Sequence, residues 1–548
     1  MVIGETTPGR ALFLAKRPPR LGEFVIIEHD EGFVLGMVED SVAGSPFISD
    51  DSTDIEAVSK MLQIVGRDRF YLKGSARTLS RLEDLMVRRK VRPVKTPPRP
   101  GARVFEADEG VLNRIFTPPG RPLLGGEAYY DEKTRRGYVR IGSLATNPNV
   151  PVYVSVDKLV ARHCAVLAMT GAGKSNAVAV LSNRIARAFG GTIVIFDFHG
   201  EYLDAFDSEV SNVIEPRINP DSLKLHEIGA LASIVPSYHK QYRALRALYG
   251  LARALRSSGE GGGKNVVELM IELADAIEDR EAGEGLRSLL ASSIARPERL
   301  PSEAEEHYRR LVKLSSDVLH EVAGKLEDLL SRYRGFLSSS APRDLSRLIV
   351  PRKLNVVDLS HVDREGCDVF VSFVSRSLLE ARKRWVVSGG REGYPTPALL
   401  VLEEAHTLVP KGEEQTNTKT VFSQIAREGR KFGVGLCLVS QRPKSLDENS
   451  LSQTCSKIVL RIVEPEDQYY VQRTSEQLSR ELVSLLPSLD VGEAVVFGEF
   501  ALFPALVKID EFGAKSMGRD PDVVGEWLKT SRESGRELDE FIEMQFSS

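Results

Sequence analysis

The fold of this chain is decided by the stretch Ala168-Met169-Thr170-Gly171-Ala172-Gly173-Lys174-Ser175. The apolar run Cys164–Leu167 comes before it and is typical of a buried strand, while residues 176–188 follow it with the pattern of a helix. A strand, a glycine-rich loop ending in Lys-Ser and a helix together form the P-loop arrangement, which binds nucleotide phosphates. The usual P-loop begins with Gly, whereas Ala168 stands here, and Ala suits this place if its φ is negative.

The residue types in this loop match the chemistry of a nucleoside triphosphate. Lys174 places a positive charge on the β- and γ-phosphates, and the hydroxyl of Ser175 is a ligand for Mg²⁺. ATP and Mg²⁺ are therefore the expected cofactors. Backbone N–H groups of the loop and of the helix N-terminus surround the phosphates. The predicted nucleotide-binding residues are Thr170, Gly171, Ala172, Gly173, Lys174, Ser175 and Asn176.

A pair of glutamates after a second apolar run supports this interpretation. The run Ala398–Leu402 predicts a buried central strand of a parallel sheet, and Glu403 and Glu404 follow it directly. Ligands of open α/β sheets bind at the carboxyl ends of the strands, so these acids are expected to face the nucleotide. Glu403 is predicted to hold Mg²⁺, and Glu404 to orient and deprotonate the attacking water. An alternative is that the two acids only cap the next helix.

Composition narrows the class of protein. The chain has 548 residues, 42% hydrophobic and 27% charged, which predicts a soluble protein of several domains. No apolar run reaches about 18 residues and the N-terminus lacks a signal pattern, so a cytoplasmic location without a membrane span is expected. The net charge of −4 implies that any contact with nucleic acid comes from local patches. Neither zinc spacing nor a disulfide framework is formed by the four cysteines, which are expected to be buried free thiols: Cys164, Cys367, Cys437 and Cys455.

Pattern changes along the chain predict three regions. Residues 1–156 carry short strand-like runs separated by turn residues, which favours an N-terminal β-barrel. Residues 157–510 alternate strand and helix patterns, which predicts an α/β class, parallel-sheet P-loop ATPase core of the RecA-like kind. Residues 225–345 have helical spacing and are expected to be an inserted helical subdomain, and residues 511–548 a polar tail that packs on its own domain or braces a neighbouring subunit. The strand-like runs of the first region are residues 23–28, 34–40, 61–65, 104–106, 138–141 and 152–156.

Two charged segments and two histidines allow more than one interpretation. Residues 88–103 hold seven basic residues, four prolines and no acid, which favours a solvated basic loop over a contact with DNA. Residues 411–419 are one guess for a loop that contacts DNA. His199 and His406 lack partners at metal-ligand spacing and are expected to be hydrogen-bonding residues of the site.

Three further segments, together with the P-loop and the glutamate pair, resemble the HerA group of the HerA–FtsK ATPases. The resemblance covers about residues 10–510 and implies that the N-terminal region is a HAS-type barrel. It also implies a homo-hexameric ring that uses ATP to move along double-stranded DNA, acting with a NurA-type nuclease in processing DNA ends. The segments are Asp197-Phe198-His199-Gly200-Glu201-Tyr202, Ile425-Ala426-Arg427-Glu428-Gly429-Arg430-Lys431-Phe432-Gly433 and Leu438-Val439-Ser440-Gln441-Arg442-Pro443.

The resemblance also implies roles for single residues. Glu404 would be the catalytic glutamate, and Gln441, at the tip of the strand after Ala398–Leu402, would sense the γ-phosphate. Asp197 would end the strand beside the P-loop strand and polarise the site.

Three arginines are candidates for a finger that reaches a phosphate. Arg430 and Arg427 are expected on one helix, and Arg162, just before the P-loop strand, is a further candidate for a contact in trans. A surface ion pair is the alternative for each of them. If the finger acts in trans, hydrolysis requires a ring.

Other classes stay possible at this point. A DEAH-type helicase is suggested by residues 403–406, but no second long α/β block follows residue 510. A conjugative or cell-division DNA pump of the same superfamily usually carries membrane spans. A scaffold ring would use ATP as a switch to recruit and position a nuclease.

Overall fold

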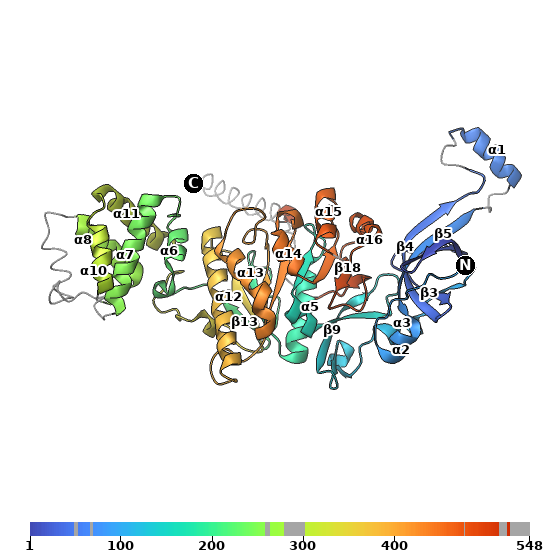
Figure 1. The fold of residues 1–548 in the computed structure, drawn as a ribbon, viewed down its shortest axis with the longest axis horizontal. Coiled ribbons are helices and arrows are strands. Elements are labelled where there is room, and N and C mark those ends of the chain that lie inside the picture. The colour runs from blue at the N-terminus through green and yellow to red at the C-terminus, as the bar shows by residue number, and fades with distance from the viewer. Residues whose placement is uncertain are drawn as a thin grey trace, which may run out of the picture.

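Three parts follow one another along the longest axis of the molecule: a helical bundle, an α/β core and an N-terminal barrel (Figure 1). Among the described residues, no helix is both long enough and apolar enough to cross a lipid bilayer. The computed structural model describes residues 1–48, 53–65, 70–257, 263–278, 302–475, 477–513 and 523–525.

The N-terminal barrel is built from six described strands in the order β1-β2-β5-β4-β3-β6. Backbone hydrogen bonds between Val2 and residues 101–102 join the first strand to the segment leading into the last one, which closes the sheet. Alternate side chains point inward, as a half-buried strand pattern predicts. The strands are β1 (Val2–Thr7), β2 (Arg10–Ala15), β3 (Phe24–His29), β4 (Gly32–Gly44), β5 (Tyr71–Arg81) and β6 (Val104–Glu106).

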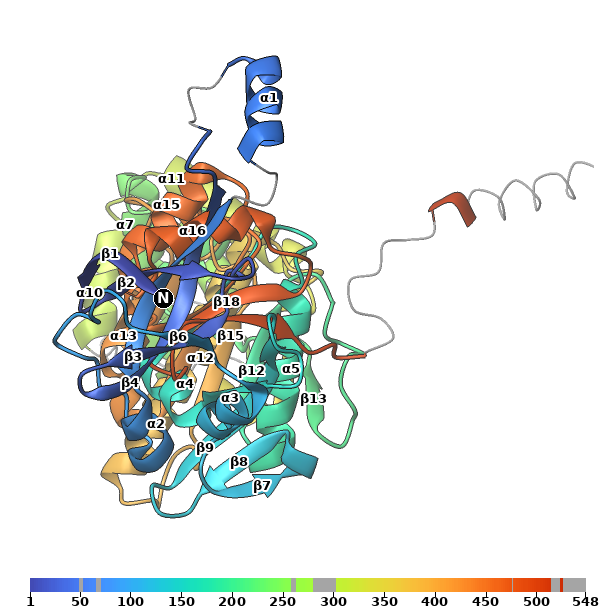
Figure 2. The same cartoon turned by 90° about the vertical axis from the view of Figure 1, so that its right-hand side faces the viewer.

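One strand predicted for the barrel is a helix in the structure. Residues 61–65 belong to helix α1 (Ile55–Val65), which stands away from the barrel at the end of the β4–β5 ribbon (Figure 2). The apolar residues Ile55, Val58, Leu62 and Val65 recur at helical spacing, which a window of five residues hides.

The core holds a sheet of 13 described strands. Its parallel part has the order β13-β14-β12-β15-β16-β11-β17, and antiparallel strands β18, β19, β9, β8 and β7 extend it, with β10 beside β9. The predicted strands at residues 164–167 and 398–402 are present, and burial on both faces explains their unbroken apolar runs. The parallel strands are β11 (Cys164–Leu167), β12 (Thr192–Asp197), β13 (Ser211–Ile214), β14 (Leu354–Asp358), β15 (Ala398–Leu402), β16 (Val434–Ser440) and β17 (Ser456–Leu460).

The strands expected at residues 138–141 and 152–156 pair with the core instead of the barrel. The change of sheet therefore falls between β6 and β7, earlier in the chain than the expected boundary at residue 156. Strand β9 pairs antiparallel with β19, which places β9 and its neighbour β10 in the core sheet. The antiparallel strands are β7 (Arg121–Leu123), β8 (Ala128–Asp131), β9 (Arg136–Leu144), β10 (Pro151–Ser155), β18 (Glu493–Gly498) and β19 (Ala505–Ile509).

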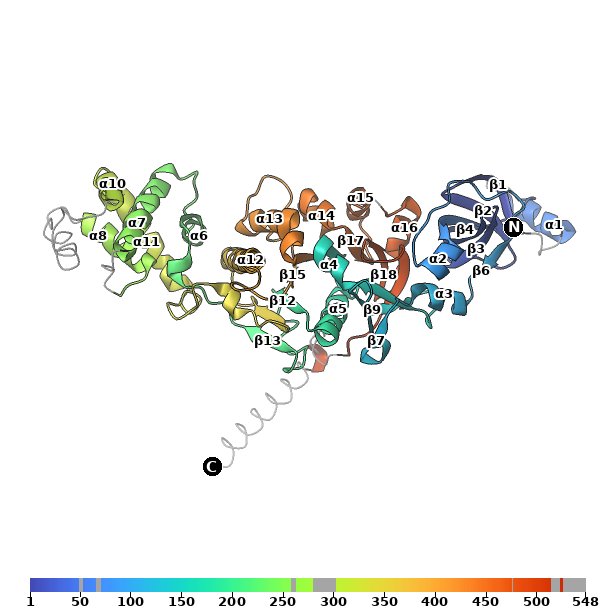
Figure 3. The ribbon, with the colours of Figure 1, turned by 60° about the horizontal axis from the view of Figure 1, so that its bottom comes forward.

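Helices cover both faces of the core sheet. Figure 3 shows α12 (Arg364–Val387) and α13 (Asn417–Phe432) on one side and α5 (Lys174–Phe189) on the other. Helix α4 (Val156–Arg162) packs with α13 against β16. Two short helices, α2 (Leu82–Arg88) and α3 (Glu109–Phe116), lie between the barrel and the core.

The described residues between 225 and 332 are mostly helical and extend from the β13 and β14 side of the sheet (Figure 1). Most of the tail expected at residues 511–548 lies outside the described residues. The described helices of this insertion are α6 (Leu225–Leu231), α7 (His239–Ser257), α8 (Val266–Glu278), α10 (Ser302–Leu311) and α11 (Ser316–Arg332).

Candidate active site

The P-loop joins the end of β11 to the start of α5. Gly171 and Gly173 have φ of 75° and 102°, a region that side chains rarely adopt. A Cβ at Gly173 would lie 3.3 Å from Cα of Gly492, whereas one at Gly171 would meet no protein atom. The loop therefore packs against its own core on one side and presents open backbone on the other, which fits a phosphate group. Ala168 keeps a negative φ, so it is compatible with its place at the start of the motif.

The structure brings the P-loop lysine and the glutamate pair together across the sheet. Nζ of Lys174 lies 2.5 Å from Oε1 of Glu404 and 3.3 Å from Oε2 of Glu403. Burial acts to lower the pKa of Lys174, but the two carboxylates outweigh it and raise the pKa. The lysine is thus held as a cation at the carboxyl end of β15.

Glu403 is the more buried of the two acids, with 4% of its surface exposed. The phenol of Tyr202 donates a hydrogen bond to its Oε1. Burial raises the pKa of Glu403, against the opposing effects of Lys174 and Tyr202. Burial also raises the pKa of Tyr202 far above its usual value, so the phenol keeps its proton and remains a donor. Before any Mg²⁺ is bound, the carboxylate of Glu403 is therefore already in contact with Tyr202 and Lys174.

Glu404 adopts a φ of 41°, which is unusual for a residue other than Gly. Such backbone conformations concentrate at functional sites, where the surrounding structure holds them. The hydroxyl of Thr407 donates to the backbone carbonyl of Glu404 at 2.8 Å, and N–H of Ala405 donates to the carbonyl of Val439. No helix starts here, and α13 is capped by Thr416 instead, so the alternative of a helix-capping acid pair is wrong.

His406 lies beside the glutamate pair. Its Nδ1 is 3.3 Å from Oε2 of Glu404 and 3.2 Å from Oγ of Ser440. Burial lowers the pKa of His406, although Glu404 opposes this. Within the described ranges, no three His, Cys, Asp or Glu side chains are grouped to hold a metal on their own.

Asp197 organises the turn after β12. Its carboxylate accepts hydrogen bonds from the backbone N–H groups of four successive residues, at 2.8–3.2 Å: His199, Gly200, Glu201 and Tyr202. Burial raises its pKa, against those four hydrogen bonds. The expectation that β12 lies beside the P-loop strand is wrong, because β15 and β16 lie between β12 and β11. Asp197 reaches the site through the turn that it fixes.

That turn supplies two residues for which no role was predicted. Tyr202 reaches Glu403, and the carboxylate of Glu201 accepts a hydrogen bond from the hydroxyl of Ser175. Both residues lie within five positions of the end of an apolar strand, which is the only feature of the sequence that marks them as candidate site residues.

Gln441 lies directly after β16, the strand between β15 and the P-loop strand β11. The hydroxyl of Thr170 in the P-loop donates a hydrogen bond to its side-chain oxygen. Gln441 therefore touches the loop that would hold the γ-phosphate, as a sensor requires.

Asn176 has a different partner from the one expected. Its side-chain amide donates to the carbonyl of Asp510 at 2.8 Å and accepts from N–H of Phe512 at 2.8 Å. Only the backbone of Asn176 is left for the predicted nucleotide-binding role. The side chain fixes the end of the core to the P-loop helix.

The candidate arginines lie away from the P-loop of their own chain. Arg430 lines a cavity of about 530 Å³ together with Thr192 and Ala398, the first residues of β12 and β15. Lys174 is at the opposite end of β15, a strand of 5 residues, so the two sites are separated along the sheet by about 15 Å of strand. Arg427, on the same helix, is also exposed.

Arg162 is found in an ion pair, the alternative considered for it. Its Nε lies 3.4 Å from Oε2 of Glu499, which also accepts from Lys158 at 2.9 Å. The hydrogen bond from Lys158 and the charges of Lys158, Arg162 and Arg430 lower the pKa of Glu499. Arg162 and Arg430 thus share one electrostatic neighbourhood at the far end of the sheet.

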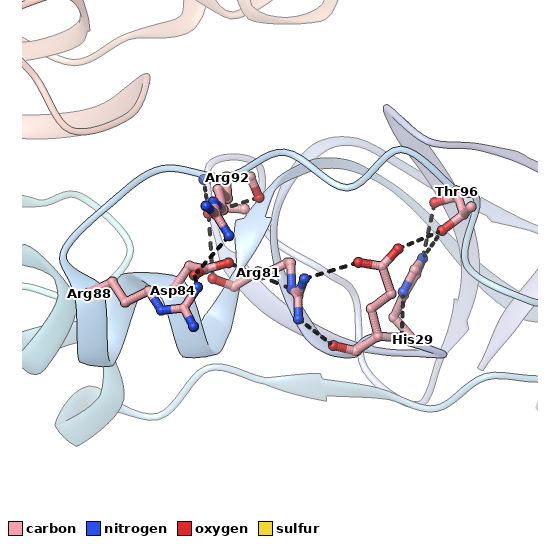
Figure 4. A network of polar contacts seen from close by, with 8 residues as sticks. His29, Arg81, Asp84, Arg88, Arg92 and Thr96 are labelled. Carbon is pink, nitrogen blue, oxygen red and sulfur yellow. Dashed lines mark hydrogen bonds and ion pairs between the residues drawn. The ribbon is translucent and has the colours of Figure 1, made fainter.

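The basic stretch at residues 88–103 is largely engaged by acids of the same chain. Asp84 lies 3.0 Å from Arg88 and 3.9 Å from Arg92 in the network of Figure 4. This arrangement favours a solvated basic loop. Two further pairs along the stretch are Arg99 with Asp30 and Arg103 with Glu28.

The guessed DNA-contact loop at residues 411–419 contains one lysine with a structural role. Lys419 is buried and donates to the carbonyls of Pro410 and Gly412 at 2.9 and 2.8 Å. Lys411 is exposed and lies over the ring of Tyr470.

Among the cysteines, Cys455 is exposed, contrary to expectation, whereas Cys164, Cys367 and Cys437 are buried free thiols.

Lys174→Ala is expected to weaken ATP binding about 10- to 100-fold, because a charged hydrogen bond contributes about 1.5–3 kcal/mol. Titration calorimetry with a non-hydrolysable ATP analogue measures this. Lys133→Ala, which removes an exposed lysine between β8 and β9, is the matched control. Unchanged affinity in Lys174→Ala would show that the phosphates are held elsewhere.

Comparisons with known proteins place the chain among described families. A family model described as the central domain of helicase HerA matches residues 139–378, and one described as a HAS barrel domain matches residues 1–84. The chain is 37% identical over 531 residues to the DNA double-strand break repair helicase HerA of Saccharolobus solfataricus, covering 96% of this chain and 95% of that protein. The protein of the same name from Sulfurisphaera tokodaii is 36% identical over 97% of both chains. A solved structure, the bacterial conjugative coupling protein TrwB, aligns with a TM-score of 0.46 at 14% identity over 76% of this chain and 94% of that one.

Proposed function

Because the chain belongs to the HerA family of helicases, we propose that it works as a hexameric ring that moves along double-stranded DNA, in the processing of DNA ends with a NurA-type nuclease. ATP hydrolysis by the P-loop site drives this movement. The observation that supports the ring is the separation of Arg430 from Lys174 within one chain. A finger at that distance serves only the site of a neighbouring subunit.

The contacts of Lys174 suggest how ATP prepares its own hydrolysis. Lys174 binds Glu404 at 2.5 Å, and an incoming phosphate competes for the same ammonium group. Once Lys174 turns to the phosphate, Glu404 is free to accept a proton from the attacking water. Mg²⁺, when bound, neutralises charge on the β- and γ-oxygens.

Gln441 connects this chemistry to the rest of the core. Its contact with Thr170 joins the tip of β16 to the P-loop, so loss of the γ-phosphate changes the hydrogen bonds available to both residues. The segment after β16 leads into the exposed Arg442, which such a change would displace.

DNA-stimulated turnover is expected to weaken as salt rises. Movement along any sequence requires contacts to phosphates, and these release counterions. Raising the salt from about 50 to 200 mM should therefore increase the DNA concentration for half-maximal stimulation at least about tenfold. Turnover without DNA, measured over the same salt range, is the control. Stimulation that does not depend on salt would contradict a channel that grips phosphates.

The experiment that tests the proposal combines turnover with mass in solution. ATP hydrolysis is measured with and without linear double-stranded DNA, and the mass of the same sample is determined by light scattering. Stimulated turnover by a hexamer supports the proposal. A monomer stimulated by RNA would indicate a DEAH-type helicase, and a ring without turnover would indicate a scaffold. Addition of a NurA-type nuclease to the ring then tests the partner by a further increase in mass.

A further inference from the structure

We infer that Glu201 positions the hydroxyl of Ser175 for Mg²⁺, a role in the ATPase site that rests on the function proposed above. The hydroxyl of Ser175 donates its hydrogen bond to Oε2 of Glu201. Glu201 comes from the turn after β12, and Ser175 from the first turn of α5. The contact therefore joins the turn after β12 to the first turn of α5.

The position of Glu201 is fixed by its backbone. Asp197, which is 1% exposed, accepts N–H of Glu201 at 3.2 Å and N–H groups of the flanking Gly200 and Tyr202 at 2.9 and 2.8 Å. Tyr202 is anchored in turn on Glu403. A carboxylate on so constrained a turn reaches Ser175 with little loss of conformational freedom.

The chemistry of a serine ligand explains what this contact achieves. A hydroxyl has one hydrogen and two lone pairs, so an acceptor that takes the hydrogen leaves a lone pair to face the metal. Acceptors behind a metal ligand orient it and increase its basicity. The negative charge of Glu201 also lies close to the cation that Ser175 would hold.

Glu403, the acid expected to hold Mg²⁺, has other partners. Its Oε1 accepts from Tyr202 and its Oε2 lies 3.3 Å from Nζ of Lys174. The carboxylate in contact with Ser175 is that of Glu201. Glu201 is also only half-buried, so its charge is less costly to maintain than that of Glu403.

The test compares nucleotide affinity with Mg²⁺ and with EDTA in the full chain. A non-hydrolysable ATP analogue is titrated by calorimetry, and the ratio of the two affinities gives the magnesium effect. Glu201→Ala is expected to reduce this effect at least about tenfold while leaving the affinity in EDTA unchanged. Glu201→Gln, which keeps an acceptor without the charge, should recover part of it. Asp204→Ala, an exposed acid three positions along, is the matched control.

A double variant shows whether Glu201 acts through Ser175. Ser175→Ala should lose the magnesium effect, and adding Glu201→Ala should cause no further loss. A further loss would identify Glu201 as a metal ligand in its own right and overturn the positioning role. Equal losses with Mg²⁺ and EDTA in Glu201→Ala would also overturn it, because they indicate a damaged loop. Absence of nucleotide binding by the unaltered chain would instead refute the proposed function.

Discussion

Replacing Glu404 by Gln is expected to lower ATP turnover about 10³-fold and to leave ATP binding intact, because a positioned general base contributes about 10²- to 10⁴-fold. Gln has the same shape and still accepts a hydrogen bond from Lys174, but it cannot take a proton from water. The variant should therefore bind nucleotide and DNA and stop before hydrolysis. Single-turnover hydrolysis and calorimetry on the same sample separate the two effects.

Two further variants sharpen this experiment. Glu392→Gln removes an equivalent charge from an exposed loop and should hydrolyse ATP at the normal rate. Glu403→Gln keeps its hydrogen bond from Tyr202 and should lose less turnover than Glu404→Gln. If Glu404→Gln turns over normally, the base is another residue, and the strained φ of Glu404 needs a different explanation.

Replacing Arg430 by Ala is expected to lower turnover about 10³-fold, as the loss of an arginine finger does elsewhere. ATP binding should be unchanged, because Arg430 lines a cavity at the end of β15 opposite to Lys174. Lys431→Ala, the next and equally exposed basic residue, is the control. Arg427→Ala, one turn earlier on α13, shows whether the effect belongs to Arg430 or to its neighbour.

Mixing of subunits tests whether the finger acts in trans. Arg430→Ala and Lys174→Ala chains are each inactive in this scheme, for different reasons. When they assemble together, some interfaces combine an intact P-loop from one chain with an intact Arg430 from the next. Turnover should then recover in the mixed ring. No recovery would mean that both residues serve the same chain.

The parts of the fold that sequence predicted best are those with burial on both faces. The strand Ala398–Leu402 is apolar throughout because helices cover both sides of the sheet. The last residues of helix α1 have the pattern of a strand, because its apolar side chains Ile55 and Ile64 are 86% and 85% exposed and no buried face marks the helical period. Without burial, an apolar pattern says little about the element that carries it.

The site was predicted less completely, for a geometric reason. Contacts of Lys174 with Glu404 follow from strand order and could be expected, although 230 residues separate them. The contact of Ser175 with Glu201 depends on the conformation of a turn that Asp197 holds by hydrogen bonds. The spacing of residues in the sequence does not indicate that conformation. Chain order also misled the placement of Asp197, since β11 and β12 are consecutive in sequence but separated in the sheet.

Asn176 ties the C-terminal end of the core to the P-loop helix through Asp510 and Phe512. The chain that continues beyond residue 513 therefore starts from a fixed point beside the nucleotide. Tethering of this kind gives a segment an effective concentration in the millimolar range, roughly, when the linker is short. A partner surface within reach of that point therefore needs only a weak intrinsic affinity for a segment tethered there.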